Sequence, residues 1–495
     1  MVFSGLIFLY IFLPLALLLY FAMPGIGRKN IVLTALSLLF YAWGEPVWVV
    51  LLLFSSLLDY TVGRAIGRWR GRWQAKLALL VSLVGNFSLL GFFKYIDFAV
   101  GNLNLLGMGL PLPGIALPIG ISFYTFQTVS YSLDCYRGKV GVQKRFSDFL
   151  LFVSLFPQLI AGPILRYSDI ETQLRDRRHS WAEAAHGMAR FAVGLGKKVL
   201  LANYAAKAVT ELLANPSQIS LSGLAAGDAW LGILMFAFQI YFDFSGYSDM
   251  AIGLGRIFGF HYPENFRYPY ISRSITEFWR RWHISLSSFF RDYVYIPLGG
   301  NRRGRVRQVF NILAVWFLTG LWHGAAWNFV AWGIYYAVLL IFEKFLLKPL
   351  VKKLPLPPWL KSGMGWCYAF FFVLIGWALF FTPDPEAFGH ADLVSSPFFY
   401  LRRSLQHLLA LLGLGGGGFS GVDWGQHIVM LAVCAVSFTP LPALLTQRFR
   451  KAAERGGVAE HAFGAARLAL IVSLFFLCTV QLVGATYNPF IYFRF

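Results

Sequence analysis

Long apolar runs separated by short polar or basic loops are the dominant pattern along this chain. A helix needs about 20 residues to cross a bilayer, and the longer runs approach or exceed that length. The candidate spans are residues 2–23, 31–43, 47–60, 77–93, 115–133, 149–165, 188–201, 231–244, 309–342, 366–381, 428–438 and 466–483. Several of them are too short or too interrupted to be simple membrane spans. The pattern predicts an all-α polytopic membrane protein.

The loops between these runs indicate an orientation. The first run has no charge before Arg28 and lacks the basic start of a signal peptide, so we interpret it as an uncleaved first helix. Arg28 and Lys29 follow it, the next short loop holds Glu45, and the loop over residues 64–76 is strongly basic. Because short basic loops stay on the cytoplasmic side, the N-terminus is expected outside.

The run over residues 149–165 does not fit simple alternation, because basic residues flank both of its ends. It contains PQLIAGP (residues 157–163), whose prolines and glycine allow the chain to turn back within the membrane. Broken helices at membrane depth are tolerated only where protein buries them or where they line a cavity. A re-entrant segment around an interior cavity is therefore predicted.

Composition and charge support a membrane protein and argue against nucleic-acid binding. The 495 residues are 57% hydrophobic and 13% charged, whereas soluble proteins carry about a quarter charged residues. The net charge of +20 comes largely from short basic loops, which is typical of cytoplasmic loop retention, and no nucleic-acid partner is expected. The cysteines are scattered and suggest neither a disulfide framework nor a metal site. They are Cys135, Cys367, Cys434 and Cys478.

Polar residues inside apolar segments are the clearest functional signals in a membrane protein. The first cluster is QIYFDFSGYSDMAIGLG (residues 239–255), which places Asp243, Ser245 and Asp249 among aromatic residues. One interpretation is a structural polar network that caps a broken helix. The other is that an aspartate lines the cavity and orients a substrate or a catalytic partner.

The second cluster covers residues 274–304 and interleaves tryptophans with basic residues. Trp279 and Trp282 alternate with Arg280 and His283. The pattern predicts a helix at the membrane interface, with aromatic rings toward lipid or core and arginines toward water or phosphate. The basic glycine-rich stretch GGNRRGRVR follows, and it suits either the phosphates of a nucleotide-like ligand or anionic headgroups.

The third cluster is LWHGAAWNF (residues 321–329), in the middle of a charge-free stretch. Gly320 and Gly324 are four residues apart, so on one helix they would share a face that allows close approach by a neighbour. His323 adjoins that face and follows Trp322. A buried histidine is often only a satisfied core residue, but neutral imidazole is well suited to accept a proton from a hydroxyl near neutral pH.

Several segments together resemble the membrane-bound O-acyltransferase family. They are RSITEFWRRWHISLSSFFRDYVYIPLGG, LTGLWHGAAWNF, LPIGISFYTFQTVSYSLDCYRG, FPQLIAGPILRY, QIYFDFSGYSDMAIGLGRIFGF, YPENFRYPYISRSITEFW and the C-terminal YNPFIYFRF. The likeness is strongest to the bacterial branch that acetylates exported polysaccharides such as alginate. It implies a ring of tilted and re-entrant helices around a central tunnel. It also implies one membrane-embedded acyltransferase domain, with N-terminal helices in 1–110, a core in 111–345 and C-terminal helices in 346–495.

The resemblance also implies the chemistry. His323 takes the place of the family's essential histidine and His283 that of a second polar residue across the cavity, so both are expected to be catalytic, with His323 as general base. Further residues expected to bind substrate or line the tunnel are Asp243, Ser245, Asp249, Trp279, Arg280, Trp282, Trp322 and Asn328. No metal and no permanently bound cofactor are expected.

The donor implied by the resemblance is a thioester, generally cytoplasmic acetyl-CoA. The acetyl group would pass outward through the bacterial inner membrane, in contact with membrane lipid, to an extracytoplasmic partner protein or carrier and finally to a polysaccharide.

Three alternatives stay open. The chain could transfer another acyl group, for example D-alanine to a wall polymer or a fatty acid to a lipid. It could instead be a transporter or channel without enzymatic activity, or a scaffold for polymer export, although no internal repeat of the kind found in many transporters is visible. Within the enzyme class, Cys135 as an acyl-carrying nucleophile is the weaker rival, because no histidine lies near it in sequence.

Overall fold

The protein is described from a computed structural model that covers residues 1–495 except 214–220, 222, 383–395, 416–423, 454–455, 485–489 and 491–495. All regular elements in the described part of the chain are helices. Six of them are long and apolar enough to cross a membrane, or seven if the bent pair Gly425–Ser437 and Leu441–Ala453 forms one span. The predicted all-α, multi-pass membrane architecture is confirmed.

The elements follow one another in three groups, with η marking 3₁₀ or π turns. The first group is η1 (Phe8–Phe12), α1 (Leu13–Ala22), α2 (Ile26–Gly44), α3 (Val49–Arg68) and α4 (Trp73–Asn104). The second is α5 (Ile121–Arg137), α6 (Phe146–Ser154), α7 (Tyr167–Ile170), α8 (Trp181–Gly196), η2 (Lys197–Ala202), α9 (Asn203–Leu213), α10 (Ala226–Ile257), η3 (Pro269–Ile271), α11 (Ile275–Arg281), α12 (Ile284–Phe290) and η4 (Arg291–Tyr295). The third is α13 (Gly304–His323), α14 (Trp327–Phe342), η5 (Glu343–Leu347), α15 (Lys348–Lys353), α16 (Pro358–Phe380), α18 (Phe399–Leu411), α19 (Gly425–Ser437), α20 (Leu441–Ala453) and α21 (Gly457–Val483).

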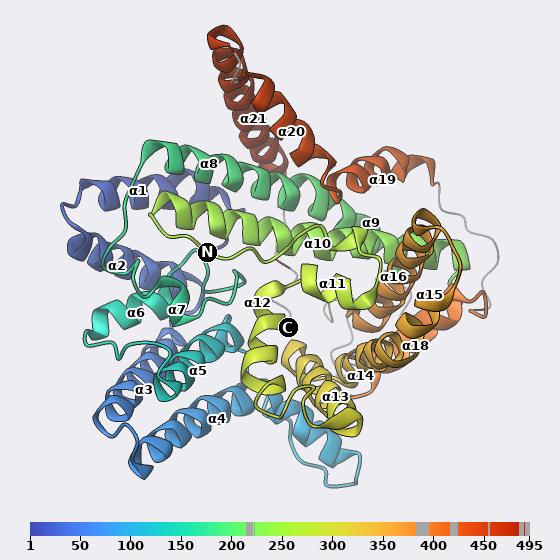
Figure 1. Ribbon diagram of the computed structural model, residues 1–495, viewed down its shortest axis with the longest axis horizontal. Helices are drawn as coiled ribbons and strands as arrows, with labels where there is room; N and C mark the ends of the chain where they lie inside the picture. Colours follow the sequence, from blue (N-terminus) through green and yellow to red (C-terminus); the bar gives the residue numbers. More distant parts are fainter. Residues whose placement is uncertain are drawn as a thin grey trace.

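The longer helices surround two short ones. In Figure 1, α11 and α12 lie in the middle, with α8 and α10 above them, α3 to α5 below on the left, and α13, α14 and α16 on the right. This arrangement agrees with the expected ring, while a tunnel through it stays a prediction. Among the candidate spans α10 is the most deeply enclosed, with 83% of its most apolar window buried.

Glycines bring α8 and α10 into backbone contact. A Cβ atom on Gly246 would lie 2.7 Å from the carbonyl oxygen of Gly194, and one on Gly253 would lie 2.5 Å from that of Gly187. Small residues at such positions let membrane helices approach closely. Because α10 is continuous through all three polar residues of its cluster, the interpretation that they cap a broken helix is wrong.

We expect Gly253→Ala to destabilise the protein by about 1–3 kcal/mol, because an added methyl group forces α8 and α10 apart. The apparent melting temperature in detergent would report the loss. Gly464→Ala on α21 is the matched control, because a Cβ atom there meets nothing within 4 Å. That change should be neutral or slightly stabilising, since alanine favours helix more than glycine does. An unchanged melting temperature for Gly253→Ala would contradict the close packing.

The predicted break in residues 149–165 is confirmed. Helix α6 ends at Ser154, and the chain then turns through buried, non-helical residues. Side chains satisfy the freed backbone amides, since Phe156 N–H donates to Ser37 Oγ at 3.1 Å and Ile164 N–H donates to Ser285 Oγ at 3.0 Å. Such compensation is what irregular backbone inside a membrane requires.

The charge-free stretch 309–342 forms two helices rather than one. Helix α13 ends at His323 and α14 begins at Trp327. Gly320 lies against the backbone of Phe329, as its expected close approach requires. The prediction that Gly320 and Gly324 share a helical face is wrong, because Gly324 has extended backbone outside the helix. The Phe329 ring fills the space where a side chain at Gly324 would lie.

Candidate functional site

His323 lies at the end of α13 in a wall of aromatic rings. Its side chain is buried, with the residue 3% exposed. The imidazole packs edge-on against Trp332 of α14 and Phe380 of α16, with ring centroids 5.0 and 5.2 Å away. Three helices therefore hold this ring, and the helix end leaves it at a break in the backbone rather than on a continuous helical face.

His283 also lies at a break. It separates α11 from α12 and has a left-handed backbone, with φ of +44°. The expected single interface helix over residues 274–304 is therefore wrong, since α11 ends at Arg281. A non-glycine residue in this conformation costs free energy, so surrounding structure must hold it there. His283 is 1% exposed, and Phe244 of α10 packs edge-on against its ring at 4.7 Å.

Asn265 fixes which nitrogen of His283 carries the proton. The Oδ1 atom of Asn265 lies 3.2 Å from Nδ1 of His283, while its amide nitrogen donates to Ser248 Oγ at 3.3 Å. A carbonyl oxygen only accepts hydrogen bonds, so Nδ1 is the protonated nitrogen of the neutral ring. Nε2 of His283 has no hydrogen-bond partner in the described part of the chain, and it presents a lone pair to the interior.

The indole of Trp322 brings the two histidines together. Its ring centroid is 5.0 Å from that of His323 and 6.0 Å from that of His283. Phe126 stacks on the same indole at 5.7 Å and keeps it in place. The two predicted histidines thus both approach one buried aromatic side chain.

The short helix α11 is held at its N-terminus by a buried carboxylate. Glu343 accepts hydrogen bonds from the backbone amides of Ile275 and Thr276 and, at 2.6 Å, from the Thr276 hydroxyl. A negative group is stabilising at a helix N-terminus, where backbone N–H groups point outward. The contact fixes the helix that leads into His283.

The remaining aromatic candidates form the packed surroundings of this centre. Trp279 packs edge-on against Trp332 at 5.5 Å, and Trp282 stacks on Phe278 with centroids 5.5 Å apart. The aromatic rings of the second cluster therefore face the core and not lipid. Asn328 is buried and donates to the carbonyl oxygen of Leu379 at 3.2 Å.

The acidic candidates lie in ion pairs between helices. Asp243 pairs with Lys198 at 2.6 Å, and Asp249 pairs with Arg190 and Lys197 at 2.9 and 2.7 Å. These contacts join α10 to α8 and η2. Ser245 is buried on the same helix, and Arg280 is exposed on α11. A role for these four residues in binding substrate stays a prediction.

Beyond α12 the chain reaches an exposed basic surface. Arg166 and Arg291 bond Asp292 at 2.8 and 2.7 Å. Partial burial alone would raise the pKa of Asp292, but these hydrogen bonds hold it below its ordinary value. The arginines of the following glycine-rich loop are exposed; they are Arg302, Arg303, Arg305 and Arg307. Both interpretations of this loop, phosphate or headgroup binding, stay predictions.

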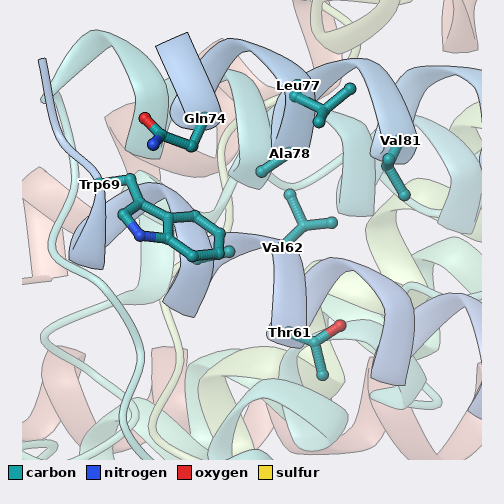
Figure 2. A pocket seen from close by; sticks show the side chains of 8 residues that line it. Thr61, Val62, Trp69, Gln74, Leu77, Ala78 and Val81 are labelled. Carbon is teal, nitrogen blue, oxygen red and sulfur yellow. The ribbon is translucent and has the colours of Figure 1, made fainter. Parts of the chain in front are cut away.

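An open apolar groove of about 340 Å³ lies between α3 and α4 (Figure 2). Its lining consists of Thr61, Val62, Ala65, Trp69, Gln74, Leu77, Ala78 and Val81. Lys94 of α4, which does reach α13, lies about 20 Å further along the helix axis than Val81, at 1.5 Å per residue. The groove therefore takes no part in the histidine centre.

Sequence reasoning missed Asn265 and Lys94. Asn265 stands among aromatic and charged residues without a recognisable spacing to His283. Lys94 had a usable signal, since it is a lone lysine within a long apolar stretch. The predicted span ended at residue 93, whereas α4 continues to Asn104. The C-terminal motif over residues 487–495 lies outside the described part except for Phe490, which is buried and packs on Tyr247 at 4.9 Å.

Comparison with known proteins identifies the family. Residues 112–381 match the model of the membrane-bound O-acyltransferase family. The chain is 36% identical over its full length to the full length of the probable alginate O-acetylase AlgI of Pseudomonas putida. It is 44% identical to the probable alginate O-acetylase AlgI of Azotobacter vinelandii, over 77% of this chain and 75% of that one. It is 34% identical to the peptidoglycan O-acetyltransferase of Helicobacter pylori, over 78% of each chain.

The matched region contains both histidines, Trp322 and Asn265, and the relatives named above are described as probable alginate O-acetylases and a peptidoglycan O-acetyltransferase. The expected family is therefore confirmed, and a transporter without enzymatic activity is not supported. This chain belongs to the membrane-bound O-acyltransferase family and is a multi-pass membrane O-acyltransferase.

Proposed function

We propose that the protein moves acetyl groups from cytoplasmic acetyl-CoA through the bacterial cytoplasmic membrane for O-acetylation of an exported polysaccharide such as alginate. The direct acceptor would be an extracytoplasmic partner protein or carrier. One observation carries the proposal. Two buried histidines meet at one indole, in a chain similar along its full length to a probable alginate O-acetylase.

Acetyl transfer from a thioester to a hydroxyl needs a base and a place where both substrates meet. In the proposed step the hydroxyl oxygen attacks the thioester carbonyl carbon while its proton passes to the imidazole of His323. The carbon–sulfur bond then breaks, and the imidazolium returns the proton to the departing thiolate. A positioned base of this kind contributes about two to four orders of magnitude in rate, and fixed orientation of the reactants adds more.

His283 is suited to orient the hydroxyl. With Nδ1–H committed to Asn265, its Nε2 atom offers a lone pair and accepts a hydrogen bond. It would stabilise a developing oxyanion only after protonation. The aromatic rings around both histidines exclude water, which strengthens every polar interaction in the site and protects the thioester from hydrolysis.

The test is thioester turnover by the purified protein in nanodiscs or proteoliposomes. Radiolabelled acetyl-CoA is supplied on one side, and a hydroxyl-bearing acceptor, either alginate oligomer or the extracytoplasmic partner, on the other. We expect labelled acceptor and free CoA to appear together. Acetyl-CoA should be preferred over a long-chain acyl-CoA and over a D-alanyl carrier protein. Preference for either of the other donors would overturn the acetyl assignment while leaving the acyltransferase class intact.

A further inference from the structure

Lys94 is a buried lysine of α4 that lies within a candidate membrane span. Among the described residues no carboxylate forms an ion pair with its ammonium group. Its Nζ atom instead donates to the carbonyl oxygens of Trp322 at 2.5 Å and His323 at 3.5 Å. An ionisable side chain at membrane depth is costly, and those that persist usually have a function.

The next residue of α4 acts in the same way. The hydroxyl of Tyr95 donates to the carbonyl oxygen of Leu321 at 2.7 Å. Two consecutive residues of α4 therefore bind three consecutive carbonyl groups at the end of α13, those of residues 321–323.

These carbonyls need such donors. The last four carbonyl groups of an α-helix have no partner within the helix, and here the helix ends in the protein interior rather than in water. The chain leaves α13 through extended backbone at Gly324, so the usual glycine cap with a left-handed residue is absent from this helix end. A cation at the C-terminus also complements the negative end of the helix dipole.

We propose that Lys94 and Tyr95 are positioning residues that hold the interrupted end of α13, and with it the His323 imidazole, in register with His283. The proposal rests on the proposed function, in which His323 is the general base. Without these donors the terminal turn of α13 would open to satisfy its carbonyls elsewhere. A displacement of about 1 Å in a catalytic group costs on the order of 100-fold in rate.

The test compares Lys94→Met and Tyr95→Phe with the wild-type protein in the acetyl-transfer assay. We expect Lys94→Met to lower kcat about 100-fold and Tyr95→Phe to lower it about 3- to 10-fold, with KM for the donor unchanged in both, because orientation and not binding is lost. Lys94→Arg, which keeps a cation and N–H donors, should recover a large part of kcat.

Ser122→Ala is the matched control. The hydroxyl of Ser122 accepts from the same Lys94 ammonium at 3.4 Å, and no hydrogen bond joins it to α13 among the described residues. The Ser122→Ala variant should keep kcat within about twofold of wild type, since only the packing around the Lys94 side chain changes. A loss as large in Ser122→Ala as in Tyr95→Phe would overturn the proposal, because the effect would then follow general packing around Lys94.

A readout independent of activity separates this proposal from the proposed function. Hydrogen exchange of the backbone amides in residues 321–328 should accelerate in Lys94→Met and Tyr95→Phe, while exchange in α8 and α10 stays as in wild type. Unchanged exchange and unchanged kcat in a folded Lys94→Met protein would overturn the positioning role alone. Accelerated exchange in a protein whose wild type turns over no acyl donor would support the helix-end role and refute only the proposed function.

Discussion

Replacing His323 with alanine should lower acyl transfer by about two to four orders of magnitude in a protein that still folds. The expected loss is this large because the variant lacks the proposed general base, while His283 keeps only its role of orienting the hydroxyl. The imidazole is enclosed by Trp322, Trp332 and Phe380, whose rings offer no base. Single-turnover release of CoA from labelled acetyl-CoA, with acceptor in excess, would measure the step itself.

His407→Ala is the matched control for this experiment. His407 of α18 is as deeply buried as His323, and its Nε2 atom lies 3.3 Å from the carbonyl oxygen of Ala229, away from the histidine pair. Both variants lose a buried histidine and should therefore be less stable than the wild type. Only His323→Ala should also lose turnover. Full turnover in a folded His323→Ala protein would remove the general-base assignment, and the weaker rival nucleophile Cys135 would then be tested next.

The second large effect is expected at Asn265. Asn265→Leu should lower turnover about 10- to 100-fold, the range found when a metal-binding histidine loses the hydrogen-bonded partner that orients it. Without the Oδ1 acceptor only the longer contact with Ser285 Oγ, at 3.4 Å, remains at Nδ1 of His283. The neutral ring then more readily populates the tautomer whose Nε2 carries a proton. That tautomer donates to the incoming hydroxyl and cannot accept from it. Steady-state kinetics with the acceptor varied would show the loss.

Two variants test the tautomer argument. Asn265→Asp keeps an oxygen acceptor toward Nδ1 and should retain more activity than Asn265→Leu. Ser248→Ala removes the partner of the Asn265 amide nitrogen without touching His283, and its effect on turnover should be small. Equal losses in Asn265→Asp and Asn265→Leu would show that the residue matters for packing around His283 and not for the position of its proton.

The sequence supports the fold class well because hydropathy is a local property. Apolar runs and basic loops are visible residue by residue, so the existence of helices such as α3, α4 and α16 is predictable, although each of them extends beyond its predicted span at one end or both. The break after α6 was also predictable, since PQLIAGP carries its own turn chemistry. Helix breaks that lack proline and glycine of this kind were not predictable. Helix α11 ends at Arg281, two residues before His283, and α13 ends at His323; only tertiary contacts decide that these helices stop there.

Residues that act through other residues were the least visible. His323 and His283 stand in distinctive motifs, so both were predicted from the sequence. Lys94 and Asn265 are separated from the histidines they contact by 229 and 18 positions, respectively, along the chain. A single sequence contains no signal for such pairings, because they arise only when α4 packs against α13 and when the loop before α11 folds back on α12.

The left-handed backbone at position 283 restricts which residues evolution can place there. Apart from glycine, asparagine, aspartate and histidine adopt this conformation most readily, and β-branched residues do so at high cost. Drift at this position can thus exchange one short polar side chain for another without refolding the loop, and the chemistry of the site would change while its architecture stayed the same. The backbone conformation at position 283 therefore limits the side chains that the site can contain to a few residue types.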